Sequence, residues 1–331
     1  MKIVSPSIEI MRTGLETEVI LPEQFIEKVG RTCYKSEDKI TNDSAAKFVS
    51  NLVKRGHEAM IEHWSLIFKM DRELYEVMID NWNDLLHDAN SIPGYLRPYL
   101  RFSDYMQCDG EMRYLVSGNM RAWRDFMRAF VKKCGMIPDF LYGMVRNYTL
   151  FFPEFQDYVP PIIVNDQLIP ISVSELSRNE RLIHQDVTVK FICDRGVTHE
   201  IVRHRAGSYA QESTRYCNYG LDKFEHSISV VEPRFINEAY YYNRTDITEI
   251  WREATLAAEK AYFDLLELGC APQEARCVLP TDLKAEIIVT MNIDGWLHFF
   301  ELRDANSAHP DIREVAQLTK CQMDIDDIWE F

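Results

Sequence analysis

The stretch from Val187 to Cys193 constrains the fold more than any other feature of this chain. Its apolar residues alternate with Thr188 and Lys190, a period of two that is typical of a β-strand with one buried face. Asp194-Arg195-Gly196 then predicts a turn, and Val197–Arg205 predicts a helix. A half-buried strand joined directly to a helix indicates that helices and a sheet share one core.

Hydrophobic spacing predicts the other elements. Helices are expected over Ser44–Arg55, Asp71–His87, Ser117–Lys133, Glu249–Leu268 and Leu297–Leu302. Gly56 is the expected end of the first helix, and Ser117 is the expected N-cap of the third. Short strands are predicted at Trp64–Met70 and Met112–Val116, and the prolines from Pro138 to Pro170 exclude long helices between them.

The charge balance limits what the chain binds. Its 37 Lys and Arg residues against 52 Asp and Glu residues give a net charge of -15, so we expect no general attraction to nucleic acid or to a membrane. No apolar run reaches the roughly 18 to 20 residues of a membrane span, and the first residues show no signal-peptide core. We therefore expect a cytoplasmic protein, in which any anionic ligand needs a local basic pocket.

Cysteine and glycine patterns exclude several classes of protein. The eight cysteines include no C-x-x-C pair, which disfavours a zinc ribbon and a disulfide framework. Neither G-x-G-x-x-G, G-x-x-x-x-G-K-[ST] nor G-x-S-x-G occurs, so a Rossmann domain, a P-loop and a hydrolase elbow lose support.

The segment RHRAGSYAQESTRY is the densest in chemically useful side chains. Together with Arg195 it contains four arginines, at 195, 203, 205 and 215, and Ser208 and Ser213 add hydroxyl donors. Arginines give permanently charged, bidentate hydrogen bonds, so this concentration predicts a phosphate or carboxylate pocket. The alternative is a solvated basic surface neutralised by Glu200 and Glu212.

Two further clusters carry candidate residues. GHEAMIEHW, from Gly56 to Trp64, suggests a metal site, but its histidines are six apart rather than the four of H-E-x-x-H, so hydrogen-bonded histidines are the alternative. Toward the C-terminus, His298-Phe299-Phe300 followed by Arg303 suits stacking on a planar ring beside a cation. An ordinary amphipathic helix would show the same pattern.

Together these clusters resemble the flavin-dependent thymidylate synthases. The signature of that family is R-H-R-x-x-S-x-x-x-x-S-x-R, and its fixed positions are occupied here by Arg203, His204, Arg205, Ser208, Ser213 and Arg215. The family also has an upstream H-E-x-x-x-E-H segment, similar to His57–His63. The family's downstream segments A-R-x-V-L-P, N, H-F-F-x-L-R and A-Q-x-E-I-R are similar to Ala275–Pro280, Asn292, His298–Arg303 and Ala308–Arg313.

The resemblance implies reductive methylation of dUMP to dTMP by a methyltransferase that uses FAD. Methylenetetrahydrofolate would donate the carbon and NADPH the hydride. Arg303 would be the catalytic residue, because a fixed cation stabilises the electron-rich, N3-deprotonated pyrimidine. No cysteine stands in the Pro-Cys-His/Gln context of the classical enzyme, which agrees with a flavin route. The family is homotetrameric, so we expect a homotetramer.

The resemblance also implies site residues. For dUMP they are Glu200, Ile201, Val202, Arg203, Gln211, Glu212, Ser213, Thr214, Arg215, Arg276 and Arg303. For FAD they are His57, Ala59, Arg203, His204, Arg205, Gln211, Asn292, Ile293, Asp294 and His298. No metal ligand is implied. The chain departs from the family at Ala59, where a hydroxyl residue is common, at Asp294, where many relatives are basic, and at His309-Pro310.

The chain is also longer than the family core. We expect residues 1–70 and 186–331 to form that core, with 71–185 as an inserted, largely helical subdomain between two strands that pair. Its own core would surround Trp82, Trp123, Phe126 and Phe130. Arg97, Arg101 and Arg113 are expected to be solvated surface residues, with attraction to a polyanion as the alternative. The predicted fold is α+β, with a mixed or antiparallel sheet and long helices.

Two alternatives to the enzyme remain at this point. One is a non-enzymatic nucleotide- or RNA-binding protein that uses only the cradle from Arg203 to Arg215. The other is a zinc hydrolase that uses His57 and His63.

Overall fold

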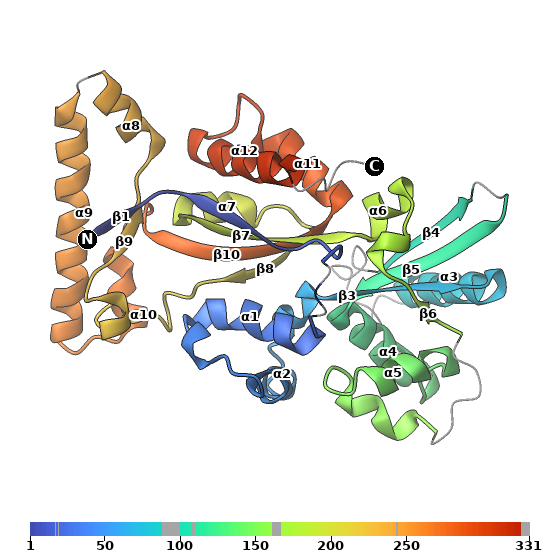
Figure 1. The fold of residues 1–331 in the computed structure, drawn as a ribbon. Coiled ribbons are helices and arrows are strands. Elements are labelled where there is room, and N and C mark those ends of the chain that lie inside the picture. Colours follow the sequence, from blue (N-terminus) through green and yellow to red (C-terminus); the bar gives the residue numbers. More distant parts are fainter. Residues whose placement is uncertain are drawn as a thin grey trace.

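The computed structural model describes residues 1–331 except 17, 19, 88–99, 108–109, 161–166, 243 and 326–331, and the side chains at 85–87, 237, 239–241 and 325 are also outside the described part. Arg97 falls outside it. Within this part, antiparallel sheets and helices alternate along the chain (Figure 1). The predicted α+β class is confirmed.

A four-stranded antiparallel sheet forms the centre of the molecule. Its order is β2 (Ser7–Arg12), β7 (Asp186–Asp194), β10 (Lys284–Asn292) and β8 (Ser208–Gln211). β7 is the strand predicted from alternation, and its side chains at 187, 189, 191 and 193 are buried. β10 pairs with all of β7, which sets Asn292 opposite Asp186. This register fixes where the helix after β10 begins.

Helices cover both faces of the central sheet (Figure 1). One face packs against α7 (Arg195–Ile201), α11 (Ile293–Arg303) and α12 (Pro310–Ile325). The other packs against α1 (Pro22–Tyr34), and α2 (Ser44–Lys54) lies behind it. Trp296 and Phe299 of α11 are fully buried, and each contributes about 4 to 6 kcal/mol of gross hydrophobic stabilisation. The end of α11 is therefore firmly placed.

A second antiparallel sheet includes strands of the 71–185 segment. Its order is β4 (Leu100–Met106), β5 (Met112–Asn119), β3 (Ser65–Met70) and β6 (Ile169–Pro170). The helices of the segment are α3 (Arg72–His87), α4 (Met120–Cys134), α5 (Tyr142–Asn147) and α6 (Arg178–His184). The prediction that β3 pairs with β7 is wrong, because β2 and β10 occupy both edges of β7. β4 and β6 were not predicted.

The 71–185 segment shares its core with the N-terminal helices. Its four predicted core residues lie in one buried cluster: Trp82, Trp123, Phe126 and Phe130. The same cluster continues through Ile26 of α1 and through Val49 and Leu52 of α2. The prediction of a core belonging to this segment alone is therefore wrong, since packing against α1 and α2 buries apolar surface on both sides.

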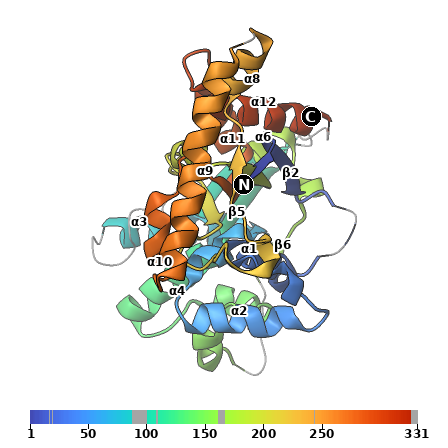
Figure 2. The same ribbon diagram turned by 90° about the vertical axis from the view of Figure 1, so that its left-hand side faces the viewer.

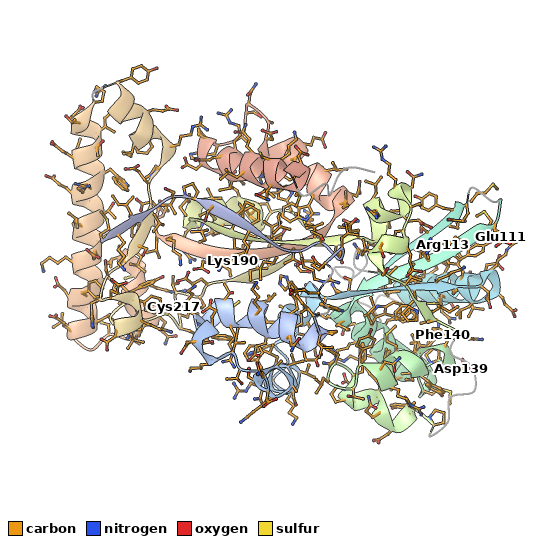
Figure 3. All side chains as sticks on the ribbon, in the orientation of Figure 1. Glu111, Arg113, Asp139, Phe140, Lys190 and Cys217 are labelled. Carbon is orange, nitrogen blue, oxygen red and sulfur yellow. The ribbon has the colours of Figure 1, made fainter. Side chains whose placement is uncertain are left out.

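A long helix closes the opposite end of the molecule. There β1 (Lys2–Val4) and β9 (Ser229–Val231) pair in parallel beside α9 (Thr245–Glu267), with α8 (Arg234–Tyr241) and α10 (Pro272–Ala275) near its two ends (Figure 2). Figure 3 labels Cys217 toward this end, Lys190 in the central sheet and Arg113 in the second sheet. None of the helices in the described ranges is long and apolar enough to cross a membrane.

Short 3-10 helices join these elements, at Glu37–Lys39, Glu58–His63 (η2), Asp139–Leu141 (η4), Pro153–Tyr158, Val173–Glu175, Asp222–Phe224 and Arg276–Val278. The predicted helix over Ser44–Arg55 is confirmed as α2, and Gly56 has the positive φ of 70° expected after it.

The helices predicted from Glu249 and from Leu297 begin earlier, at Thr245 and Ile293, and two other differences at helix ends affect residues near the arginine-rich segment or an expected cap. α7 stops at Ile201 instead of Arg205, because the chain must turn before β8 pairs Ser208 with Thr290 of β10. α4 begins at Met120, and its N-cap is Asn119, whose side chain accepts a 2.8 Å hydrogen bond from the Ala122 backbone. The predicted cap, Ser117, belongs to β5. The early end of α7 leaves Arg203, His204 and Arg205 on a turn instead of a helix.

Candidate functional site

Arg303, the last residue of α11, is held by Glu200 of α7 and by His204 of the turn that follows α7. Its Nη1 donates to Glu200 Oε2 at 2.7 Å, and its Nη2 donates to the Glu200 carbonyl at 3.1 Å. Its Nε donates to His204 Nε2 at 3.1 Å. Three directed hydrogen bonds fix the plane of a guanidinium, so Arg303, Glu200 and His204 form one unit.

His204 is packed against α11 and is neutral near pH 7. Its ring centroid lies 4.9 Å from that of Phe299 and 6.1 Å from that of His298. Burial, with the nearby charges of Arg303 and His298, lowers the pKa of His204 to about 4. A neutral ring accepts the Arg303 hydrogen bond at Nε2 and carries its proton on Nδ1.

These residues line a pocket between the 203–206 turn and α11. Its volume is about 420 Å³, within the roughly 300 to 1,000 Å³ of small-molecule sites. The lining carries three guanidinium groups and two imidazoles, from Arg203, Arg205, Arg303, His204 and His298, and it is completed by Ala206, Met291, Gly295 and Leu302. In a chain of net charge -15, this cationic pocket offers the local positive potential that an anionic ligand requires.

A second cationic group follows β8. Arg276 Nη1 donates to Thr214 Oγ1 at 3.2 Å, and the Arg215 backbone donates to Ser213 Oγ at 3.3 Å. The side chains of Arg215 and Arg276 are exposed, and the Arg215 guanidinium lies 5.6 Å from the ring centroid of Tyr216. Two exposed guanidiniums beside two hydroxyl groups suit a phosphate.

β8 connects the two cationic groups. Gln211 of β8 donates from Nε2 to Thr198 Oγ1 of α7 at 3.0 Å, which ties the strand to the helix that carries Glu200. Arg215 and Arg276 are not among the described residues that line the cationic pocket of Arg303. The convergence of all three arginines on one ligand therefore stays a prediction.

Other residues predicted for dUMP turn away from the cationic pocket. Ile201 is buried in the core beneath α7. Glu212 is buried, and it accepts hydrogen bonds from Lys284 Nζ at 2.9 Å and from the Tyr219 hydroxyl at 3.5 Å. Val202 is exposed beside Arg203. The side chains of Ile201 and Glu212 thus serve the packing of the chain, and a contact with a ligand would use their backbone.

The residues predicted for FAD at the start of α11 lie in different environments. Asn292 caps the helix, accepting from Gly295 N at 3.0 Å, and its Nδ2 donates to the carbonyls of Leu182 and Ile183 at 3.2 and 3.1 Å. Ile293 is fully buried, whereas Asp294 is exposed. His298 is exposed and lines the cationic pocket. The Asn292 side chain therefore has its two donors engaged within the protein.

The two histidines of the His57–His63 segment have unlike surroundings. His57 and Ala59 are exposed at the start of η2. His63 is fully buried, its Nδ1 lies 2.8 Å from Thr290 Oγ1, and burial lowers its pKa to about 3. Among the described residues, no group of three or more His, Cys, Asp or Glu side chains is arranged to hold a metal. His63 matches the alternative of a hydrogen-bonded structural histidine.

Sequence reasoning missed two ion pairs of the 71–185 segment, one that joins it to β7 and one within the segment. Arg101 donates from both terminal nitrogens to Asp186, at 2.7 and 2.9 Å, and Arg113 pairs with the buried Glu180 at 3.4 Å. The prediction that Arg101 and Arg113 are solvated is wrong: their side chains are 14% and 13% exposed. Asp186 is the first residue of β7, and the residues after it are buried. A carboxylate next to a buried strand needs a partner, and this is the signal in the sequence that could have predicted the Arg101 ion pair.

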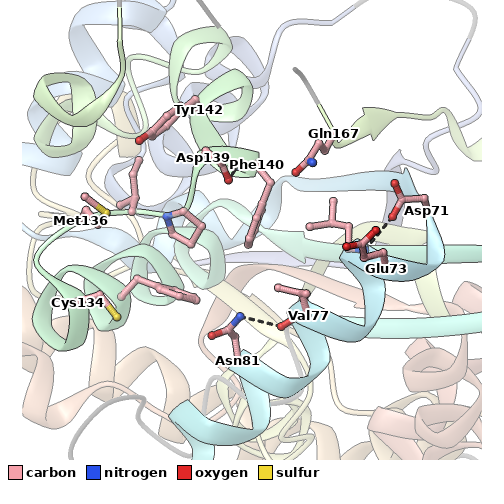
Figure 4. Close-up of a pocket in the computed structure, with 14 residues that line it drawn as sticks. Asp71, Glu73, Val77, Asn81, Cys134, Met136, Asp139, Phe140, Tyr142 and Gln167 are labelled. Atoms are coloured by element: carbon pink, nitrogen blue, oxygen red, sulfur yellow. Dashed lines mark hydrogen bonds between the residues drawn. The ribbon is translucent and has the colours of Figure 1, made fainter. Parts of the chain in front are cut away.

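A separate pocket lies inside the 71–185 segment (Figure 4). Its volume is about 670 Å³, and α3 faces α4 and η4 across it. Its charged lining residues are Asp71, Glu73 and Asp139, and neither Lys nor Arg occurs among its described lining residues. Although this pocket is larger, its charge is wrong for a nucleotide, so the cationic pocket is the better candidate site.

Comparison with known proteins settles what the arginine-rich half of the chain resembles. Residues 174–324 match the family described as thymidylate synthase complementing protein. The resemblance to flavin-dependent thymidylate synthases is confirmed. The flavin-dependent thymidylate synthase of Pyrococcus abyssi is 36% identical over 124 residues, 38% of this chain and 48% of the relative. That of Geobacter sulfurreducens is 35% identical over 126 residues, 37% of this chain and 49% of the relative.

A third flavin-dependent thymidylate synthase, from Corynebacterium glutamicum, is 30% identical over 149 residues, 44% of this chain and 60% of the relative. The chain thus spans about half the length of the curated relatives that it matches. The matched range of the family, 174–324, contains both cationic groups, whereas η2 lies before it.

Proposed function

We propose that this chain is an FAD-dependent thymidylate synthase that methylates dUMP reductively, with methylenetetrahydrofolate as carbon donor and NADPH as hydride donor. The observation that carries the proposal is the guanidinium of Arg303. Three hydrogen bonds fix its orientation, and it lines the cationic pocket. The names of the relatives support thymidylate synthesis with a flavin.

Arg303 acts on the pyrimidine. Its charge lies in a pocket where the dielectric constant is lower than in water, and there a fixed cation stabilises the N3-deprotonated ring. That ring has a more nucleophilic C5. Glu200 and His204 hold the guanidinium in place before substrate arrives, so that no reorientation is needed during the reaction. Because His204 is neutral, it supports this orientation without adding a competing charge.

The phosphate of dUMP binds at the second cationic group. Arg276, Thr214, Ser213 and Arg215 provide guanidinium, hydroxyl and backbone donors to a dianion. Gln211, at the end of β8, lies between this group and α7. The nucleotide would therefore run along β8 from its phosphate to its ring.

The donors of the cationic pocket fit a dinucleotide. Arg203 and Arg205 are exposed cations at its rim, suited to a pyrophosphate, and His298 offers a ring face. FAD, when bound, would supply the hydride chemistry, and the protein would orient it and exclude water. Asn292, Ile293 and Asp294 lie between Met291 and Gly295, which line the pocket, and His57 and Ala59 would contribute from the start of η2.

We further propose a homotetramer in which residues 71–185 are an insertion into the family core. Large apolar side chains are exposed on one side of α9: Ile250 is 69% exposed and Leu268, at the end of the helix, 83%, and their spacing is a whole number of helical turns. Such a face on one helix marks an interaction surface. Another copy packed there would bring further residues to the two cationic groups, and light scattering of the purified protein measures this assembly.

An NADPH oxidation assay tests the function. With FAD present, added dUMP should stimulate NADPH oxidation, and adding methylenetetrahydrofolate should yield dTMP, identified by chromatography. A colourless protein that neither binds FAD nor forms dTMP would overturn the proposal. Binding of RNA or nucleotide without turnover would favour the non-enzymatic alternative.

A further inference from the structure

Residues 57–63 lie between the central sheet and helix α4, which belongs to the 71–185 segment. On the sheet side, His63 is hydrogen-bonded to Thr290 of β10 at 2.8 Å. On the other side, the Met120 backbone at the start of α4 donates to the Trp64 carbonyl at 3.0 Å. The position of this segment therefore depends on both of its neighbours.

Arg121 and Arg128 of α4 donate hydrogen bonds to the carboxylates of Glu62 and Glu58. Arg128 donates from Nη1 to Glu58 Oε2 at 2.9 Å and from Nη2 to Glu58 Oε1 at 2.8 Å, a bidentate pair. Arg121 Nη1 donates to Glu62 Oε1 at 2.6 Å, and Arg124 lies 3.7 Å from Glu58. Positions 121, 124 and 128 are three and four residues apart, so they share one face of the helix.

The two carboxylates of this contact are mostly buried, whereas the Arg128 side chain is 40% exposed. The side chains of Glu58 and Glu62 are 12% and 11% exposed, and Arg124 is 3% exposed. Burial opposes the charge of Glu58, but the hydrogen bond from Arg128 and the charge of Arg124 outweigh it, so the pKa of Glu58 lies below its ordinary value. Loss of one guanidinium would leave a partly desolvated carboxylate, a cost that moving the segment toward water relieves.

Residues 57–63 also lie near two residues that line the cationic pocket, Ala206 and Met291. Glu62 lines a small cavity of about 20 Å³ together with Ala206, Ser208 and Met291. Ala206 and Met291 line the cationic pocket as well. Through Glu62, η2 therefore borders a cavity that shares these two lining residues with the cationic pocket, and Glu58 joins the other end of η2 to α4.

We propose that Arg128 is a positioning residue, which holds η2 through Glu58 and so fixes the wall of the cationic pocket for flavin binding. This inference rests on the proposed function, and it gives the 71–185 segment a role in that function. Arg121 acts in the same way through Glu62. Neither arginine touches the ligand, so its loss weakens binding without removing a reacting group.

The test compares Arg128→Gln with Lys133→Gln. Lys133 is on the same helix and pairs with the exposed Asp84 at 3.5 Å. Lys133→Gln therefore also removes one exposed positive charge from α4, but it does not remove a contact with η2. In Arg128→Gln, amide exchange at 57–63 in the flavin-free protein should rise about tenfold, and the Kd for FAD, from flavin fluorescence, should rise about tenfold, equivalent to about 1.4 kcal/mol. At saturating FAD, kcat should stay within about twofold. Lys133→Gln should change none of these values.

Two outcomes would overturn the inference while leaving the proposed function intact: unchanged exchange at 57–63 in Arg128→Gln, or an unchanged Kd for FAD despite faster exchange. If the unaltered chain binds no FAD, the proposed function fails and the ligand part of this inference fails with it. Glu58→Gln removes the same bond from the other side and replaces Arg128→Gln if that variant does not fold. The double variant should be no weaker for FAD than either single variant.

Discussion

Arg303 and Glu200 are joined twice, once through the carboxylate at 2.7 Å and once through the backbone carbonyl at 3.1 Å. The second bond does not depend on the side chain of residue 200, so it ties the end of α11 directly to the end of α7. This relationship makes Arg303 a fixed charge and leads to the first prediction.

Arg303→Ala should fold and bind flavin but lose dTMP formation by about 10² to 10³-fold in kcat, the usual effect of removing one preorganised donor. Thermal unfolding, flavin fluorescence and product chromatography measure these three properties. Arg252→Ala is the control, because Arg252 is an exposed residue on α9. Turnover within tenfold of the original chain would contradict the role given to Arg303.

Arg276→Ala should weaken dUMP binding about 10- to 100-fold, because a charged hydrogen bond contributes about 1.5 to 3 kcal/mol. Binding of deoxyuridine, which lacks the phosphate, should be unchanged. Titration calorimetry with both compounds measures the difference. An equal loss for deoxyuridine would place Arg276 away from the phosphate.

His184 should make the stability of the chain fall in acid. It is fully buried between Ser103 and Ser117, each at 2.7 Å from a ring nitrogen. Burial first, and then the charge of Arg101, lowers the pKa of His184 to about 3. Its ordinary value is about 6.5, so below that pH the unfolded chain takes up a proton that the folded chain refuses until about pH 3.

The stability contributed by neutral His184 is thus complete above about pH 6.5 and decreases as the pH falls toward 3. Between pH 7 and pH 5 this one residue should cost about 2 kcal/mol of unfolding free energy. Urea unfolding of the original chain and of His184→Asn should show a smaller loss between these pH values in the variant. His226→Asn, at an exposed histidine, should leave the loss unaltered.

Asp186→Asn should destabilise the junction between the two sheets. Asp186 is 8% exposed and accepts two hydrogen bonds from Arg101 and one from Ser65. Removing one partner of a buried ion pair leaves the other charge unpaired, at a cost of about 3 to 5 kcal/mol. The double variant Arg101→Met, Asp186→Leu should recover much of that loss in urea unfolding. If Asp186→Asn lowers the unfolding free energy by less than about 1 kcal/mol, water hydrates the charge of Arg101 in the variant and the predicted cost of an unpaired charge is wrong.

Local patterns predicted many of the elements and the residues of the cationic pocket. Alternation identified β7, and helical spacing identified α2, α3 and α9, because these patterns arise from one buried face. The signature from Arg203 to Arg215 lies on the turn that lines the cationic pocket and on β8. It did not reveal that Ile201 and Glu212 face the core, since side-chain direction at the end of a short helix depends on what packs beside it.

The pairing of distant strands and of distant charged residues could not be predicted from the sequence. Nothing in Ser65–Met70 shows that β3 joins β5 and β6 instead of β7, because each of these strands has an apolar face that fits either partner. The ion pairs from Arg121 and Arg128 to Glu62 and Glu58 were missed for the same reason: the residues lie 59 and 70 positions apart.

The amino-acid sequence by itself determined the local conformations and the supply of cations, since hydrophobic period, caps and residue chemistry act over a few neighbouring positions. Only the tertiary structure decided which cation meets which partner: Arg303 with Glu200 and His204, Arg276 with Thr214, and Arg128 with Glu58. These choices depend on the packing of α11, α7 and α4 on the sheets. Such packing is a balance of buried area and desolvation over the whole chain, which no single segment encodes.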